Sequence, residues 1–196
     1  MIKLAEIFKS IQGEGLYTGH PAVFIRLAGC NIDRCHFCDT DFEYRRQASI
    51  EAIVEEVKQL AGDKVKLVVI TGGEPFVQDL RDLVYFLSND FTVQIETNGT
   101  IIPDHFASYW GTADIVVSPK ALPVDDIMKR KAAAVKFVVK DGMKPCTRTY
   151  TCPVYVQPMD EKDLVKNKAN LDWAVKLCLE HGYRLSLQIH KILDIQ

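Results

Sequence analysis

The sequence predicts an α/β fold in which parallel strands form an incomplete, modified TIM-type barrel. Short runs rich in β-branched residues alternate with helical patterns along the chain, which is typical of βαβ units. Polar residues gather where the predicted strands end, as they do in parallel α/β proteins. The chain has 196 residues, fewer than the roughly 250 of a complete eight-stranded barrel. An open, curled sheet therefore fits better than a closed one.

Seven segments have the composition of strands. They are Ala22–Leu27, Leu67–Thr71, Thr92–Thr97, Asp114–Ser118, Val135–Lys140, Val154–Gln157 and Leu185–His190. By alternation, Gln94 and Glu96 share one face, and so do Ser186, Gln188 and His190. Strands buried on both faces would normally be apolar throughout. These inward polar positions predict a wet interior that holds a ligand.

Helical patterns lie between several of the strands. One follows Ser49, a suitable N-cap, and ends at Gly62. Two others cover Asp79–Asn89 and Asn170–Gly182, and Cys178 is expected to lie in the core on the apolar face of the second. No linker, low-complexity segment or fixed-period repeat divides the chain. We therefore expect a single domain over residues 1–196.

The composition excludes several classes of protein. The net charge of −2 gives no sign of a surface for nucleic acid or membrane. No apolar stretch is long enough to span a membrane, and the N-terminal MIKLAEIFKS lacks a signal-peptide core. We expect a cytoplasmic protein. Thiols stay reduced in that compartment, so clustered cysteines indicate metal binding or catalysis rather than disulfides.

Three of the six cysteines fall within nine residues, with the spacing Cys-x4-Cys-x2-Cys: Cys30, Cys35 and Cys38. A structural zinc site would need a fourth ligand. Asp39 is one candidate for this ligand. His36 could reach the same ion only under strain. Cys146 and Cys152 are distant in the sequence and could be ligands only if the fold brings them to the same ion. Alternatively, three thiolates could hold an iron–sulfur cluster. A fully ligated cubane uses four, so three would leave one iron open to a small molecule. The spacing favours the cluster over zinc, and both remain open.

The cysteine loop is followed, after the next predicted strand, by Gly72-Gly73-Glu74-Pro75, and this combination resembles the radical S-adenosylmethionine (SAM) enzymes. The resemblance extends over nearly the whole chain. The segments IQGEG, AVFIRLAGC, CDTDF, TGGEP, IETNG, SPK, QPMD and RLSLQIHK are together similar to the 7-carboxy-7-deazaguanine synthase family. The family's usual first spacer is three residues rather than four, which should change the loop's path and not its ligands. QIHK stands where relatives often read QTHK.

This resemblance implies a radical SAM core and a lyase activity. The reaction is the ring contraction of 6-carboxy-5,6,7,8-tetrahydropterin to 7-carboxy-7-deazaguanine with loss of ammonia, on the route to queuosine and other 7-deazapurines. It also implies a [4Fe-4S] cluster on the three cysteines, SAM on the open iron, and Mg²⁺. The expected partners are a flavodoxin-like electron donor and a second copy of the chain in a homodimer.

The resemblance also assigns residues to each ligand. Thr40 would contact Mg²⁺. The substrate would be bound by Ile11, Gln12, Gly13, Glu14, Arg26, Thr71, Glu96, His190 and Gln196, the last through its terminal carboxylate. The SAM site would be formed by Phe37, Cys38, Asp39, Gly73, Glu96, Ser118, Pro119, Lys120, Gln157, Pro158, Met159 and Asp160. No residue is assigned as a general acid or base, since the reactive radical comes from SAM.

Several of these residues also have a purely structural interpretation. Thr40 could form a hydrogen bond with the backbone of its own loop. Glu14 could pair with a nearby base, and Arg26 could form an internal salt bridge. His190 could be a satisfied core histidine, and Phe37 could simply anchor its loop. Two other functions stay open: another small radical SAM enzyme, such as a glycyl-radical activating enzyme, and a non-enzymatic metal-binding module. The module would not explain polar residues at six strand ends.

Overall fold

The computed structural model describes residues 1–32, 35, 37–109, 111–120 and 122–196. The described residues form one nine-stranded sheet in the order β3-β1-β2-β4-β5-β6-β7-β8-β9. The strands are β1 (Ile2–Ile11), β2 (Pro21–Leu27), β3 (Arg46–Ala48), β4 (Leu67–Gly72), β5 (Thr92–Thr97), β6 (Asp114–Val117), β7 (Ala134–Val139), β8 (Val154–Pro158) and β9 (Arg184–Leu185).

The sheet is parallel from β2 through β4 to β9, whereas β1 runs antiparallel to both β2 and β3. The edge strands β3 and β9 do not pair with each other, so among the described residues the sheet stays open. The prediction of an incomplete parallel barrel is confirmed.

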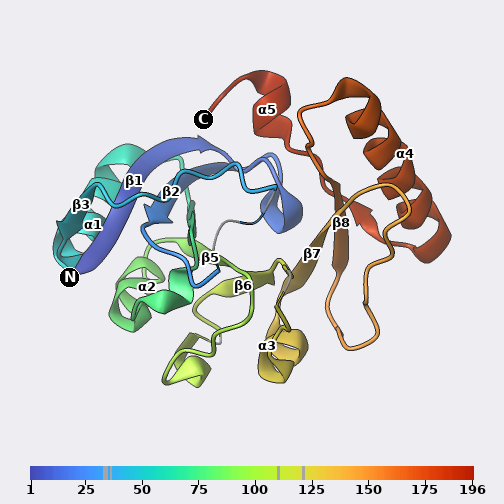
Figure 1. Cartoon of the computed structure of the whole chain (residues 1–196). Helices are drawn as coiled ribbons and strands as arrows, with labels where there is room; N and C mark the ends of the chain where they lie inside the picture. Colours follow the sequence, from blue (N-terminus) through green and yellow to red (C-terminus); the bar gives the residue numbers. More distant parts are fainter. Residues whose placement is uncertain (33–34, 36, 110, 121) are drawn as a thin grey trace.

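The α-helices are α1 (Ile50–Ala61), α2 (Arg81–Leu87), α3 (Asp126–Lys131), α4 (Leu164–His181) and α5 (Ile189–Leu193). Figure 1 shows α1 to α4 on the outer side of the curved sheet, with α5 and the C-terminus beside the end of β1. None of the helices in the described part of the chain is both long and apolar enough to cross a membrane.

Local signals explain where two of these helices begin. Ser49 Oγ accepts from the Ala52 N–H at 3.3 Å, and Gly62 caps the other end of α1, both as predicted. Helix α4 begins six residues before the predicted Asn170. The reason is Asp163, whose carboxylate accepts from the N–H groups of Val165 and Lys166 at 2.9 and 3.1 Å and so caps the helix there.

Alternation along the strands separates two apolar layers. The main core lies between the sheet and the helices and takes residues such as Val23, Ile25 and Leu27 of β2. The inner face carries a smaller cluster of Ala22, Phe24, Leu67 and Val69. Farther along the same inner face, toward the carboxyl ends of the strands, the side chains become polar. The inner apolar cluster is thus the floor of a polar interior, as the alternating strands predict.

The prediction of a strand over Leu185–His190 is wrong for the residues after Leu185. Strand β9 pairs with β8 at only two positions, and His190 lies in α5. After Ser186 the chain leaves the sheet, and the Ile189 N–H donates to the Gly13 carbonyl at 3.1 Å. The loop at Gly13, which is distant in sequence, therefore replaces the sheet as the backbone partner.

Strands β1 and β3 and helix α3 were not predicted. In β1 the pairing register with β2 shifts between Leu4 and Glu6. A bulge of this kind interrupts the two-residue alternation on which strand prediction depends. β3 and α3 are too short, at three and six residues, to show a clear period.

Candidate active site

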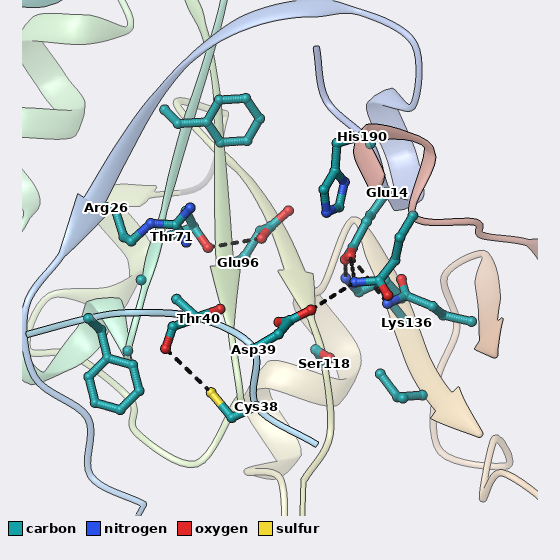
Figure 2. Close-up of a pocket in the computed structure, with 18 of the residues that line it drawn as sticks. Glu14, Arg26, Cys38, Asp39, Thr40, Thr71, Glu96, Ser118, Lys136 and His190 are labelled. Atoms are coloured by element: carbon teal, nitrogen blue, oxygen red, sulfur yellow. Dashed lines mark hydrogen bonds and ion pairs between the residues drawn. The ribbon is translucent and has the colours of Figure 1, made fainter. Parts of the chain in front are cut away.

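A cavity of about 540 Å³ opens at the carboxyl ends of the parallel strands (Figure 2). It brings together most of the predicted site residues. These are Ile11, Gln12, Gly13, Glu14, Arg26, Cys30, Cys35, Phe37, Cys38, Asp39, Thr40, Thr71, Gly73, Glu96, Ser118, Lys120, Gln157, Pro158, Asp160, His190 and Gln196. Pro119 and Met159 do not line it. Met159 is buried in the fold, and its N–H donates to the Val139 carbonyl at 2.8 Å.

The three clustered cysteines reach the cavity as free thiols. Cys30 follows β2, and the Cys38 N–H donates to the Cys35 carbonyl at 2.9 Å, which closes a turn between these two. Burial raises the pKa of the Cys30 thiol. Thiols facing one cavity are the donor set that an iron–sulfur cluster requires.

The described residues contain no group of three or more His, Cys, Asp or Glu side chains placed around a single metal ion. A cluster has a different requirement, since each thiolate binds its own iron. Asp33, Arg34 and His36 lie outside the described residues. The path of the four-residue spacer and the expected strain at His36 therefore stay predictions.

The turn after β4 contacts the cysteine loop directly. A Cβ atom on Gly73 would lie 1.9 Å from the Gly29 carbonyl oxygen, so only glycine allows this approach. The next residue, Glu74, has no exposed surface. Its carboxylate accepts from Thr97 Oγ1 at 2.6 Å and from the Asn98 N–H at 2.7 Å. Burial raises its pKa. Glu74 thus holds the turn against the end of β5, a structural role that sequence analysis missed.

Glu96 of β5 lies at the centre of a second network. Its carboxylate accepts from Gln12 Nε2 and Gln94 Nε2, each at 2.9 Å, and from Thr71 Oγ1 at 3.0 Å. Gln12 Oε1 in turn accepts from the Glu14 N–H at 3.1 Å. Both ends of the Gln12 amide are therefore engaged within the protein. Gln94 Oε1 is buried and has no hydrogen-bond partner among the described residues.

A buried ion pair joins Glu14 to Lys136 of β7 on one side of the cavity (Figure 2). Glu14 also accepts from Gln188 at 2.7 Å and from Gln157 at 3.2 Å. Burial alone would raise the pKa of Glu14, but the charge and hydrogen bond of Lys136 outweigh it and lower the pKa to about 2. The structure thus contains the pairing of Glu14 with a basic residue that was its structural interpretation.

Lys136 was missed by sequence analysis, although a signal was present. It stands between apolar neighbours in a strand, the same pattern that singled out Arg26. Burial opposes its charge, but the carboxylates of Glu14 and Glu96 raise its pKa above the ordinary value. Lys120 differs: burial, and then repulsion from Lys136, lower its pKa.

Arg26 forms the internal salt bridge that was its structural alternative. Its Nε lies 2.7 Å from Glu6 Oε1, and its guanidinium lies over the Phe8 ring at 5.4 Å. Glu6 also accepts from Gln196 Nε2 at 2.5 Å. The C-terminal residue is therefore attached to β1 at the rim of the cavity. Because β1 was not predicted, Glu6 was missed.

Helix α5 closes another side of the cavity. A Cβ on Gly13 would lie 2.0 Å from His190 Nδ1, so the imidazole packs directly on the glycine backbone. Lys191 Nζ lies 2.5 Å from Asp39 Oδ2 and 2.9 Å from Asp160 Oδ2. One ammonium thus connects α5, the cysteine loop and the loop after β8.

Thr40 and Phe37 complete the cysteine loop. Thr40 lines the cavity beside Cys38, whose Sγ lies 3.9 Å from the Thr40 carbonyl oxygen (Figure 2). Lys120 Nζ lies 5.3 Å from the centre of the Phe37 ring, a cation–π distance. The loop is therefore attached to the segment after β6.

Comparisons with known proteins agree with this architecture. Residues 24–136 match the family described as the radical SAM superfamily. The chain is 41% identical over 213 residues to 7-carboxy-7-deazaguanine synthase of Rickettsia prowazekii, covering 100% of this chain and 89% of that protein. It is 40% identical over 213 residues to the enzyme of the same name from Aquifex aeolicus, covering 100% and 95%. The fold is similar to the crystal structure of QueE from Escherichia coli, with a TM-score of 0.75 and 26% identity over 95% of this chain and 93% of that one. The chain therefore belongs to the 7-carboxy-7-deazaguanine synthase family of the radical SAM superfamily.

Proposed function

We propose that this protein contracts the ring of 6-carboxy-5,6,7,8-tetrahydropterin to 7-carboxy-7-deazaguanine and releases ammonia. One observation carries the proposal. Three free thiols share a single cavity with buried ionisable and amide side chains, at the carboxyl ends of the parallel strands. Sequence identity along the full length to enzymes named for this product supports the same conclusion.

The family implies a [4Fe-4S] cluster and SAM, and we assign the cluster to Cys30, Cys35 and Cys38. Together the two cofactors supply a radical able to abstract a hydrogen atom from the substrate. We place SAM against Gly73, which lines the cavity beside the cysteine loop, and against Ser118, Lys120 and Gln157 on the adjoining wall. Lys120 Nζ donates to Ser118 Oγ at 2.8 Å, which orients both groups along this wall.

We assign the substrate to the adjoining part of the cavity, which is lined by Glu14 and Glu96. Glu14 and Glu96 are carboxylates fixed by amide donors, so they can accept hydrogen bonds from ring N–H groups without reorganising. Gln12 acts by holding Glu96 rather than by reading the substrate directly. Arg26 also lines this side of the cavity, and its guanidinium provides the positive charge that a substrate carboxylate needs. His190 covers this side from α5.

Mg²⁺ is a further part of the proposal. The Thr40 hydroxyl is a hard oxygen donor beside the substrate side of the cavity, and Mg²⁺ usually takes few protein ligands when a substrate supplies oxygens. We also propose that the protein is a single-domain, cytoplasmic homodimer. It would receive electrons from a flavodoxin-like protein. The protein orients its ligands and excludes water, and we assign no residue as a general acid or base, because the reactive radical comes from SAM.

An anaerobic turnover assay tests this function. The iron-loaded protein is incubated with SAM, Mg²⁺, a chemical reductant and 6-carboxy-5,6,7,8-tetrahydropterin, and the product is identified by mass spectrometry. We expect 7-carboxy-7-deazaguanine and ammonia in equal amounts, and none from Cys35→Ala. The exposed-cysteine control Cys146→Ala should retain full turnover. SAM cleavage without the deazaguanine product would reject the assignment and leave another radical SAM activity.

A further inference from the structure

The side chain of Asn31, the residue directly after Cys30, is bonded to the segment that follows β5. Asn31 Nδ2 donates to Thr100 Oγ1 at 2.8 Å, and Asn31 Oδ1 accepts from Asn98 Nδ2 at 2.9 Å. An amide can do both at once because it carries a donor and an acceptor. Neither Asn31 nor Asn98 belongs to the expected ligand sets.

The orientation of this contact is determined by the rest of the network. Asn98 Oδ1 already accepts from the Thr100 N–H at 2.9 Å and from Thr100 Oγ1 at 2.7 Å. Its Nδ2 must therefore face Asn31, which in turn directs Asn31 Nδ2 to Thr100. Asn98 is 6% exposed, so its amide has little access to water as an alternative partner.

The residue on the other side of Cys30 is held by the same structure. The Gly29 carbonyl accepts from the Glu74 N–H at 3.0 Å. The Glu74 carboxylate then accepts from the Asn98 N–H at 2.7 Å. Cys30 is thus flanked by two residues that are both bonded to one buried unit made of Glu74 and Asn98.

We propose that Asn31 is a positioning residue that fixes the direction of the Cys30 thiolate toward the cluster. The spacer between Cys30 and Cys35 has four residues rather than three, and the anchored Asn31 is the first of them. An anchor there keeps the extra residue from changing the path of the chain at Cys30. The inference rests on the proposed cluster at Cys30, Cys35 and Cys38.

The test is the rate at which iron leaves the anaerobically reconstituted protein when a chelator is added. Asn31→Ala removes both hydrogen bonds, and Asn31→Asp keeps the acceptor but removes the donor. Asn89→Ala is the matched control, since Asn89 is an exposed asparagine that donates only to backbone carbonyls at the end of α2. The melting temperature of each iron-free variant is measured alongside.

Because two hydrogen bonds are lost, we expect Asn31→Ala to release iron about fivefold faster than the unsubstituted protein. Asn31→Asp should be intermediate and Asn89→Ala unchanged. The melting temperatures of iron-free Asn31→Asp and Asn89→Ala should agree with that of the unsubstituted protein within about 2 °C, because Asn31→Asp keeps the acceptor for the buried Asn98 amide. That agreement would separate a role at the cluster from a general role in folding.

Two results would overturn the inference. One is an unchanged rate of iron release from Asn31→Ala. The other is faster release from Asn31→Asp accompanied by an equal loss of stability in its iron-free form, which would make Asn31 an ordinary loop contact. A different failure, an unsubstituted protein that binds no iron, would reject the proposed function itself.

Discussion

Lys136 donates a hydrogen bond to Glu14 inside the cavity, and the two side chains are only 8% and 16% exposed. Glu14 lies in the first loop of the chain and Lys136 on β7, and the two side chains meet on one side of the cavity (Figure 2). Each charge is compensated mainly by the other. The ion pair therefore couples the folding of this region to the electrostatics of the proposed substrate site.

Replacing one partner should destabilise the protein strongly. Lys136→Met leaves the Glu14 carboxylate buried without its cation, which typically costs about 3–5 kcal/mol of unfolding free energy. The double variant Glu14→Gln/Lys136→Met should recover a large part of that loss. Chemical denaturation of the iron-free protein measures both. Lys64→Met, at an exposed lysine, is the control and should change little. An additive double variant would show that the pair is not coupled.

The same pair predicts a dependence of stability on acid. The pKa of Glu14 is lowered from 4.5 to about 2, so its contribution to stability is present above pH 4.5 and is lost as the pH falls toward 2. The raised pKa of Lys136 has the opposite sign, so its contribution is present below pH 10.5 and is lost at still higher pH. Glu14→Gln should flatten the acid side of the stability curve. If the curves of the variant and the unsubstituted protein are parallel from pH 5 to pH 2, Glu14 is not the group responsible.

Gln94 should matter more for activity than for stability. Gln94→Met removes a donor to Glu96, a hydrogen bond to a charged group worth about 1.5–3 kcal/mol. It also removes a buried, unpartnered oxygen, Gln94 Oε1, which is itself costly to bury. The two effects oppose each other, so the unfolding free energy should change by about 1 kcal/mol or less.

The lost orientation of Glu96 should appear in steady-state kinetics. We expect kcat/KM of Gln94→Met to fall about tenfold, the equivalent of about 1.4 kcal/mol. Gln59→Met removes an exposed glutamine–glutamate hydrogen bond on α1 and serves as the matched control. Equal kinetics for the two variants would contradict a positioning role for Gln94.

Lys191 should hold α5 over the cavity. Lys191→Met removes the contacts to Asp39 and Asp160, and local opening of this short helix should become easier. Hydrogen exchange of residues 189–193 should then accelerate while exchange in β4 and β5 is unchanged. Lys176→Met removes an exposed ion pair with Glu180 in α4 and is the control. Uniform acceleration throughout the chain would indicate global destabilisation instead.

Much of the fold and of the cavity could be predicted from the sequence. The two-residue period placed Glu96 on the inner face, and the end of each parallel strand located the cavity. The same reasoning applied to Val135-Lys136-Phe137 would have found Lys136. These features could be predicted because the two-residue period of a strand is visible in the local sequence. In addition, parallel strands place their functional residues at the same edge of the sheet, at the carboxyl ends.

The rest depends on contacts between distant segments. His190 reaches the cavity as predicted, but from α5 rather than from a strand, because Gly13 provides its backbone neighbour. Glu6 lies in a strand whose bulge hides the alternation. Gln12 could not be assigned to Glu96 without knowing that the first loop packs on β5. These contacts cannot be recognised from any pattern in the local sequence.

The most direct test of the account is electron paramagnetic resonance of the reduced, iron-loaded protein with and without SAM. Three thiolates on a [4Fe-4S] cluster leave one iron able to bind SAM, so we predict about four irons per chain and a spectrum that changes when SAM is added. Cys30→Ala, Cys35→Ala and Cys38→Ala should each lose the signal, and Cys146→Ala should keep it. A single zinc ion in place of iron, or a cluster spectrum that SAM leaves unchanged, would contradict the account.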